Sequence, residues 1–557
     1  MNSSSDISEK RKERLVKWLK NRNNLILIGI ILLALVLRLY YFDITNSQPL
    51  WWDEADYMAY AKNLAGLPTT WIVSSQHNSI YPFFAAILIK LGLSEEIMKF
   101  LLGIIPSFIV VILVYIISRS MYTDKRLALI NTFLMAIIWE VLFNSMRFHV
   151  DIPALLLGFI AIYVFWQGYE KQKPLFGKIN YRWAIPLTVF FTILTYSTRR
   201  GYFVFGFFFL VYMLATRKWN DLLKDRYNWI GLVLAIIMIL VIESLVFLTP
   251  ITQVAGKYSN PESSFNLLPL NVFKAFFMNN SNAVLSPLLY LFWIGLILII
   301  AGIVLSFGYI KKSKNPNLKA DIFFLITILV TLSYFLFYQQ AQGDFGEARW
   351  YFPLLFGAIV CISRSTLFIS DHIKKYSKIL AIVFILALIG YGGYAQVMQA
   401  DSSIKYRASS FQGIKDVSLS VNSLSVESDV ILGYPTPQIA YYTERTAIEA
   451  DWRADKPLSE LTPEEFIQML KDNPDIKYLI ISMFDPAYPP WMAKVNYARH
   501  PQTGQPVMVS WQLPLTNSSI DFVNNVQDIK PGISYGDIAF QFKTASQDTF
   551  AYEIIRQ

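Results

Sequence analysis

The sequence is poor in the residues on which many soluble enzymes and secreted domains depend. Cysteine occurs once in 557 residues, as Cys361 inside an apolar run, so no disulfide can form within the chain. Charged residues make up only 16%, whereas soluble globular proteins carry about a quarter. The sequence also has no glycine-rich phosphate loop, no His-Glu-x-x-His motif and no cysteine cluster, which argues against nucleotide hydrolysis and zinc proteolysis.

Apolar residues are abundant instead. They make up 54% of the chain, and many apolar runs reach the roughly 17–25 residues that span a bilayer. We therefore predict a polytopic α-helical membrane protein. A net charge of +9 would suggest nucleic acid as the partner of a soluble protein. Here the basic residues cluster in short loops, as the positive-inside rule expects, and no nucleic acid partner is expected.

About eleven transmembrane helices are predicted, with the basic segment 1–24 in the cytoplasm and the first apolar run retained as a signal anchor. The loops 43–98 and 250–286 then lie outside, and the short apolar stretch 80–93 suits an interfacial or re-entrant helix. The expected location is the plasma membrane. The predicted spans cover about residues 25–42, 100–117, 127–143, 152–166, 183–196, 202–214, 229–248, 287–307, 322–338, 350–369 and 379–394.

Residues 25–399 form the predicted transmembrane domain, and the composition turns polar from about residue 400. Short apolar runs at 429–432 and 478–482 are typical of strands. Between them, residues 463–470 form a predicted amphipathic helix, with Thr462 as its cap and Glu465 three positions later. We therefore predict that residues 400–557 fold as a small extracytoplasmic α/β domain.

An acidic cluster follows the first predicted span. Asp53, Glu54 and Asp56 lie between two tryptophans and Tyr57. Carboxylates at a membrane surface are costly unless they bind or catalyse, and such acids can act as a general base or hold a metal ion. In an extended loop Glu54 would point away from Asp53, which makes Asp53 the candidate base. The alternative is a solvated loop whose acids face water.

Further polar residues fall on the same predicted side of the membrane. Outer arginines are informative because the positive-inside rule disfavours them there, and arginine recognises phosphate bidentately. The residues concerned are Arg38, His77, Tyr81, Arg147, His149, Asp151, Arg199, Arg200 and Arg349.

Each of these residues also has a purely structural explanation. Arg38 can extend its charge to the interface or orient one of the acids. Asp151 can cap the helix that follows it, and His77 can be an ordinary loop residue. The arginines can simply pair with outer carboxylates such as Asp344 and Glu347.

Taken in order, these elements resemble the GT-C class of polyprenyl-phosphate-dependent glycosyltransferases. The closest branch contains the protein O-mannosyltransferases and the lipid A aminoarabinose transferase. The similarity extends over almost the whole chain, and the motif order makes it more specific than the Asp-Glu pair alone. It rests on Arg38, segment 52–57, His-x-x-x-Tyr-Pro at 77–82, Ser118-Arg119, and segments 145–151, 198–202, 349–353 and 433–443.

The resemblance implies a GT-C-like fold and inverting transfer of a sugar from a polyprenyl-phosphate donor to a hydroxyl of a protein, lipid or glycan. The segment that begins at His77 lacks the prolines usual in the family, which shifts the expected phosphate contacts towards the arginines. Whether a divalent metal takes part is left open. The expected roles are catalysis for Asp53, Glu54 and Asp151, donor phosphate binding for Arg349, Arg199, Arg200, His77 and Tyr81, and acceptor binding or support for Asp56, Tyr57, Arg38, Arg147 and His149.

Two alternatives remain at this point. An oligosaccharyltransferase shares the architecture but needs a metal-binding acidic set, and its usual Trp-Trp-Asp-x-Gly element is missing from the C-terminal part. A secondary transporter is the alternative of another class, although transporters often show internal repeats and broken helices near the midplane. We find no convincing repeat in this sequence, and its charged residues gather at one face.

Overall fold

The computed structural model describes residues 16–72, 79–245, 284–312, 315–337, 348–450, 453–454, 457–483, 488–499 and 506–557. The chain forms two compact units. The first comprises Met1–Asn46 and Glu95–Arg407, and the second comprises Ser47–Ser94 and Ala408–Gln557. The sequence analysis assigns the loop 43–98 to the transmembrane domain. In the structure, most of this loop, Ser47–Ser94, belongs to the same unit as the C-terminal residues.

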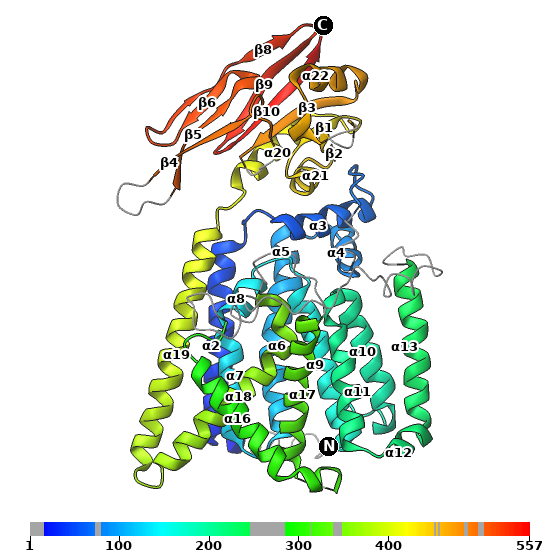
Figure 1. Cartoon of the computed structure of the whole chain (residues 1–557), viewed down its shortest axis with the longest axis vertical. Coiled ribbons are helices and arrows are strands. Elements are labelled where there is room, and N and C mark those ends of the chain that lie inside the picture. The colour runs from blue at the N-terminus through cyan, green and yellow to red at the C-terminus, as the bar shows by residue number, and fades with distance from the viewer. Residues whose placement is uncertain are drawn as a thin grey trace, which may run out of the picture. The chain divides into compact units, whose positions relative to one another are not determined.

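The first unit is a bundle of helices (Figure 1). Every predicted span coincides with a helix in the described residues, or with a pair of helices. Of the described helices, seven are long and apolar enough to cross a membrane, or eight if a bent pair counts as one span. This confirms a polytopic helical membrane protein. The main helices are α2 (Arg22–Thr45), α6 (Ile105–Met121), α7 (Lys125–Ile137), α8 (Trp139–Ser145), α9 (Asp151–Val164), α10 (Ala184–Thr198), α11 (Val204–Thr216), α13 (Arg226–Leu245), α16 (Leu289–Leu305), α17 (Pro316–Phe337), α18 (Phe352–Ile373) and α19 (Lys378–Arg407).

Shorter elements complete this unit and extend several spans. Two of them, η1 and η2, are π-helical turns, and the others are short α-helices or 3-10 turns. These elements are α5 (Glu95–Lys99), η1 (Phe100–Ile104), η2 (Phe165–Glu170), η3 (Tyr181–Trp183), η4 (Arg200–Phe203), α12 (Trp219–Lys224), η5 (Phe307–Lys312) and η6 (Ala348–Tyr351).

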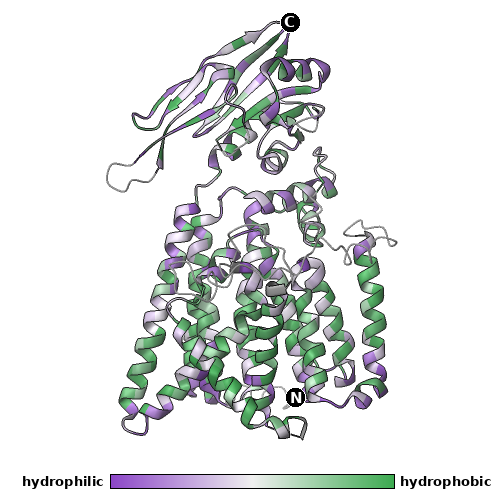
Figure 2. Ribbon diagram, viewed as in Figure 1, coloured by the Kyte–Doolittle hydropathy of each residue, from purple (hydrophilic) through white to green (hydrophobic). Residues whose placement is uncertain are grey.

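Apolar residues predominate in the helices of this unit (Figure 2). Helix α18 lies at its centre, with 83% of its apolar stretch buried, whereas the apolar stretch of α13 is only 17% buried. An exposed apolar helix surface of this kind is stable in lipid but not in water. Helices at the periphery therefore face the hydrocarbon, and α18 supplies the packed core.

One predicted span is broken. Helices α7 and α8 meet at 52°, where a single straight helix over 127–143 was expected. Ile138 leaves the helical conformation, and the Trp139 N–H donates to Oε1 of Gln396 in α19 at 3.0 Å instead of to its own helix. A side chain that replaces a lost backbone partner is a common cause of a kink. The bend directs the chain after α8 into segment 145–151.

Charged side chains tie the helix ends together at the end of α9 remote from Asp151. Glu170 in η2 pairs with Arg217 at 3.2 Å and with Lys319 at 2.7 Å. Asp151 and Glu170 are the two ends of one 20-residue span, which corresponds to about 30 Å. The basic loops thus gather opposite Asp151, as the positive-inside rule requires if Asp151 lies outside.

The second unit combines helices with two β-sheets. Strands β1 to β3 pair in parallel, and β3, β10, β9 and β8 continue the same sheet in antiparallel fashion, in the order β2-β1-β3-β10-β9-β8. A second, antiparallel sheet has the order β4-β5-β6-β7. The strands are β1 (Val430–Gly433), β2 (Thr446–Ile448), β3 (Ile476–Ser482), β4 (Lys494–Arg499), β5 (Pro506–Leu513), β6 (Ser518–Asp521), β7 (Val526–Asp528), β8 (Gly532–Tyr535), β9 (Ile538–Ser546) and β10 (Thr549–Arg556).

The predicted α/β character holds for the first part of this unit. The expected strands are β1 and β3, and the expected helix is α22, with the capping box of Thr462 and Glu465 in place. From β4 onwards the chain is almost entirely antiparallel β-structure, which the sequence did not indicate. The helices of the unit are α3 (Trp52–Ala65), α4 (Tyr81–Lys90), α20 (Gln412–Leu424), α21 (Thr436–Thr443) and α22 (Pro463–Asp472).

Candidate functional site

Asp151 is the centre of a buried ionic cluster in the first unit. Its carboxylate is fully buried, and its Oδ1 accepts from Nε of Arg199 at 2.7 Å and from the hydroxyl of Tyr202 at 3.3 Å. Its Oδ2 lies 3.7 Å from Nη1 of Arg349 and 3.7 Å from Nδ1 of His149. One carboxylate therefore holds two arginines that come from distant parts of the chain.

Local structure explains why these side chains converge. Arg199 is an extended residue between the end of α10 and the 3-10 turn η4, which begins at Arg200. Arg349 lies in another 3-10 turn, η6, immediately before α18. The Tyr202 hydroxyl also lies 3.3 Å from the carbonyl oxygen of Arg349, where it can donate, and so links the two turns. All of these turns lie at the same end of the bundle as the N-terminus of α9.

The side chain of Asp151 does not cap α9. Val150 occupies the cap position without a capping side chain, and Asp151 is the first helical residue. A carboxylate in the first turn is still favoured by the helix dipole. Its oxygens, however, serve Arg199, Tyr202 and Arg349. In this geometry the carboxylate of Asp151 lies against the two arginines.

His149 extends the cluster. Nη1 of Arg349 lies 2.5 Å from Nδ1 of His149, which places the imidazole ring against this guanidinium. Arg147 is almost fully buried, and its guanidinium lies 5.5 Å from the ring of Phe143. Segment 145–151 therefore positions His149 and Asp151 at the arginines.

Arg38 takes a different place from the one expected. It neither reaches the interface nor contacts one of the acids, but is fully buried among three helices. Its Nε donates to Ser107 of α6 at 2.8 Å, and its Nη1 donates to the carbonyl oxygens of Ala34 and Ala136 at 3.1 and 3.2 Å. The guanidinium therefore links α2 to α6 and α7 by hydrogen bonds. Its role in this structure is to hold the bundle.

The acidic cluster lies in the second unit, on a helix rather than on an extended loop. Asp53 and Glu54 are in the first turn of α3, and Asp56 follows in the second. Glu54 is buried, and its carboxylate accepts from the Trp51 N–H at 3.5 Å. Asp56 is also buried and accepts from the indole of Trp71 at 2.7 Å. Asp53 is the member of the cluster that keeps partial exposure.

Contacts within the second unit fix the start of α3. The backbone N–H of Leu50 donates to the hydroxyl oxygen of Tyr442 in α21 at 2.8 Å. Lys62 pairs with Glu444 at 2.7 Å. The ring of Trp52 lies 5.1 Å from that of Tyr434. The C-terminal part of the chain therefore sets the position of Asp53.

The remaining predicted residues of this unit are packed around α3. Tyr57 and Tyr81 are both buried, with their rings 5.9 Å apart in an edge-to-face arrangement. Burial, and next the charge of Glu54, raise the pKa of Tyr81 well above its usual value, so its phenol stays protonated. His77, Asp344 and Glu347 lie outside the described residues.

Two residues of interest were missed by the sequence analysis. Tyr202 binds Asp151, yet a tyrosine beside a basic turn gives no special signal. Lys99 is nearly fully buried where α5 meets η1, and its ammonium donates to the carbonyl oxygen of Thr45 at 2.5 Å. The sequence did offer a signal for Lys99, because this lysine directly precedes a long apolar run. A charged residue within a span needs a partner, so a buried contact could have been expected.

The described ranges contain no group of three His, Cys, Asp or Glu side chains that could hold a metal ion. In the acidic cluster, the Trp51 N–H and the Trp71 indole donate to Glu54 and Asp56.

Comparison with known proteins gives a family match in the region of the cluster. The profile of the dolichyl-phosphate-mannose-protein mannosyltransferase family matches residues 76–243, which include His149, Asp151, Arg199 and Arg200. A search of curated proteins found no match.

Solved structures with a similar fold span most of the chain. The Archaeoglobus fulgidus oligosaccharyltransferase in complex with Zn and sulfate has a TM-score of 0.57 at 13% identity, over 86% of this chain and 72% of that one. AglB from the same organism, with an inhibitory peptide and a dolichol-phosphate, gives 0.56 at 11% identity, over 90% and 76%. ArnT from Cupriavidus metallidurans in the apo state gives 0.51 at 12% identity, over 82% and 93%.

The chain is a membrane glycosyltransferase with a GT-C fold. The family match and the shared fold both support this assignment, and they confirm the resemblance drawn from the motifs. The cluster around Asp151 in the first unit and the acidic turn of α3 in the second unit are candidate functional sites, each within its own unit.

Proposed function

We propose that this glycosyltransferase moves a single sugar from a polyprenyl-phosphate donor to a hydroxyl of a protein, lipid or glycan acceptor, with inversion at the anomeric carbon. The reaction takes place on the outer side of the plasma membrane. The family match to dolichyl-phosphate-mannose-dependent enzymes supports a lipid-phosphate donor. The dolichol-phosphate bound by AglB, which shares the fold, points the same way.

The arrangement of Arg199 and Arg349 around Asp151 carries the proposal. As the glycosidic bond breaks, negative charge develops on the phosphate of the leaving lipid. Preorganised cations at developing charge are worth about 3–4 kcal/mol in typical enzymes. Asp151 accepts from Nε of Arg199 at 2.7 Å, and a guanidinium has five N–H donors in all, so it can bind a carboxylate and a phosphate together.

Asp53 is the proposed general base. An acceptor hydroxyl must lose its proton as it attacks the anomeric carbon, and a carboxylate can take that proton. The other two acids of α3 are buried and engaged, whereas Asp53 is partly exposed in the first helical turn. One base and direct displacement give inversion, with no covalent intermediate and no second nucleophile.

The test is turnover of a labelled polyprenyl-phosphate sugar by the purified full-length chain. Release of polyprenyl phosphate together with a glycosylated acceptor is expected. The matched pair is Arg349→Ala, in turn η6 before α18, and the control Arg364→Ala, in the interior of α18, where Arg364 pairs with Asp321 away from the cluster. Solute flux in proteoliposomes without release of the lipid phosphate would overturn the proposal in favour of a transporter.

Oligosaccharide transfer is the second candidate. The fold similarity to two structures of the Archaeoglobus fulgidus oligosaccharyltransferase favours it. The same assay separates the two when it is run with a single-sugar lipid phosphate and with a lipid-linked oligosaccharide, because an oligosaccharyltransferase transfers a preassembled glycan. Turnover of the lipid-linked oligosaccharide, with none of the single-sugar lipid phosphate, would replace the first proposal by the second.

A further inference from the structure

A polar cavity of about 650 Å³ lies in the first unit, far from Asp151. Turn η2, turn η3, helix α12 and the start of α13 surround it. Gly168, one of its lining residues, is 17 positions after Asp151 along the same helical span, which corresponds to about 25 Å. The cavity therefore belongs to the opposite end of the bundle, and the proposed reaction does not use it.

The lining is rich in positive charge. It contains four basic residues and two acids, a net of +2, namely Arg182, Arg217, Lys224, Arg226, Asp221 and Asp225. Arg217 pairs with Glu170 at 3.2 Å, but the other three cations have no carboxylate within 4 Å in the described part of the chain. Asp225 accepts from the backbone N–H of Tyr227 at 2.9 Å. The cavity is thus suited to an anionic ligand.

A buried acceptor complements these cations. The amide nitrogen of Asn228 donates to the carbonyl oxygen of Leu222 at 2.8 Å. Its Oδ1 is buried and has no hydrogen-bond donor among the described residues. An unsatisfied buried acceptor is costly, and a ligand hydroxyl would satisfy it. The ligand chemistry therefore combines negative charge with a hydroxyl group.

Exposed tryptophans place the cavity at the level of lipid headgroups. Trp183, Trp219 and Trp229 adjoin the cavity in sequence and are 45%, 61% and 51% exposed. Tryptophans of this kind gather at the boundary between hydrocarbon and water. The basic loops of the bundle lie at the same end, where anionic lipids are attracted to clustered lysine and arginine.

We propose that this cavity binds the phosphoglycerol headgroup of an anionic lipid. The phosphate diester contacts Arg182 and Arg226, and a glycerol hydroxyl donates to Oδ1 of Asn228. A choline headgroup brings a positive charge into the cationic lining and offers no hydroxyl. The inference does not depend on the donor or the acceptor of the proposed reaction.

Native mass spectrometry of the delipidated full-length protein tests the proposal by titration with three probes: phosphatidylglycerol, phosphatidylcholine and glycerol 3-phosphate. Phosphatidylglycerol should bind at least about tenfold more tightly than phosphatidylcholine. The double variant Arg182→Ala/Arg226→Ala should weaken phosphatidylglycerol binding about thirtyfold. Asn228→Leu should weaken it about fivefold while retaining the charge.

The matched control is Lys374→Ala/Lys375→Ala, which removes two exposed cations that follow α18, at the end remote from Arg349. It should change the affinity less than about twofold. Equal binding of the two lipids, or equal losses in both double variants, would overturn the assignment of the cavity. Binding of glycerol 3-phosphate as tightly as the lipid would overturn its assignment to a membrane lipid.

Discussion

Asp151 and Asp53 are both aspartates in the first turn of a helix, but their surroundings differ. Asp151 is fully buried in the bundle and contacts two arginines, a histidine and a tyrosine. Asp53 is partly exposed in the second unit. A buried carboxylate held by cations keeps them in place, whereas an accessible carboxylate can receive a proton. We propose that this difference in environment separates a positioning residue, Asp151, from a candidate base, Asp53.

The largest expected effect is on turnover in Asp53→Asn. Asparagine keeps the shape and hydrogen bonding but cannot accept the proton, so turnover should fall about 10²–10⁴-fold. Thermal unfolding should stay near that of the wild type. Glu54→Gln is the neighbouring control, and its effect should be milder because the glutamine amide oxygen can still accept from the Trp51 N–H. Equal losses in both variants would mean that the acids act only through the fold of α3.

Asp151→Asn should differ from Asp53→Asn, because its main effect should be on the stability of the protein. Removal of one partner from a buried ionic cluster typically costs about 3–5 kcal/mol. The melting temperature of the variant in detergent should fall clearly, and activity should fall with it. An unchanged melting temperature together with lost turnover would assign the catalytic role to Asp151.

Arg349→Ala should cost about 10²–10³-fold in turnover, since preorganised cations contribute about 3–4 kcal/mol. Expression should remain normal, and Arg364→Ala should retain most of the activity. Near-normal turnover of Arg349→Ala would show that this arginine is only a counter-ion.

The smallest expected effect comes from Gly103→Ala in the π-helical turn η1. A Cβ at this position would lie 2.5 Å from the carbonyl oxygen of Ser145, so segment 145–151 would have to move. Such overpacking costs about 1–3 kcal/mol. The control is Gly302→Ala in α16, where a Cβ would meet nothing within 4 Å. Thermal unfolding of both variants should show a loss for Gly103→Ala only.

Much of the fold could be predicted because the composition and residue spacing of each segment determine its helices. Apolar runs located the spans, and the Thr462 to Glu465 spacing located the cap of α22. The helical start of α3 escaped the analysis because acids and tryptophans also suit a loop. The bend after Ile138 depends on Gln396, more than 250 residues away, and no local pattern announces it.

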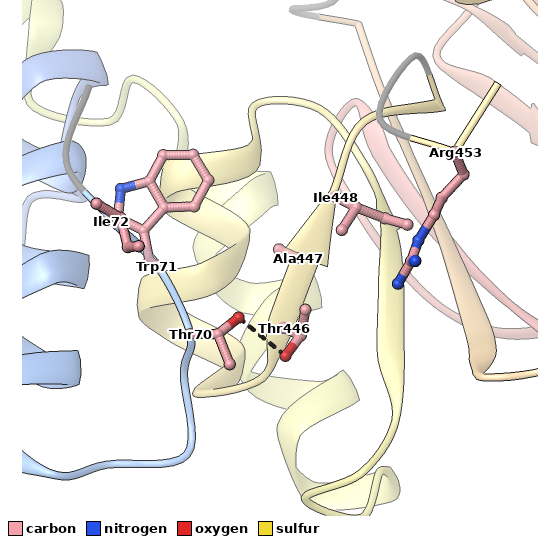
Figure 3. Close-up of a pocket in the computed structure, with 7 residues that line it drawn as sticks. All are labelled: Thr70, Trp71, Ile72, Thr446, Ala447, Ile448 and Arg453. Carbon is pink, nitrogen blue, oxygen red and sulfur yellow. Dashed lines mark hydrogen bonds between the residues drawn. The ribbon is translucent and has the colours of Figure 1, made fainter. Parts of the chain in front are cut away.

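The candidate site could be predicted as a set of residues but not as an arrangement. The positive-inside rule singled out Arg199 and Arg349, and both contact Asp151. The sequence suggests that Arg38 reaches the interface or orients an acid, yet in the structure it holds three helices together. In the second unit, Thr70 contacts Thr446 of β2 beside a cavity of about 350 Å³ (Figure 3), a contact for which the sequence analysis made no prediction. Contacts between distant segments decide these outcomes.

The most direct test measures donor binding and turnover together for Asp53→Asn and Arg349→Ala, with a labelled polyprenyl-phosphate sugar. The account predicts that Asp53→Asn binds the donor as tightly as the wild type but turns over about 10²–10⁴-fold more slowly. Arg349→Ala should lose both donor affinity and turnover. Retention of most activity by Asp53→Asn, with unaltered donor binding by Arg349→Ala, would contradict the division of roles between the two sites.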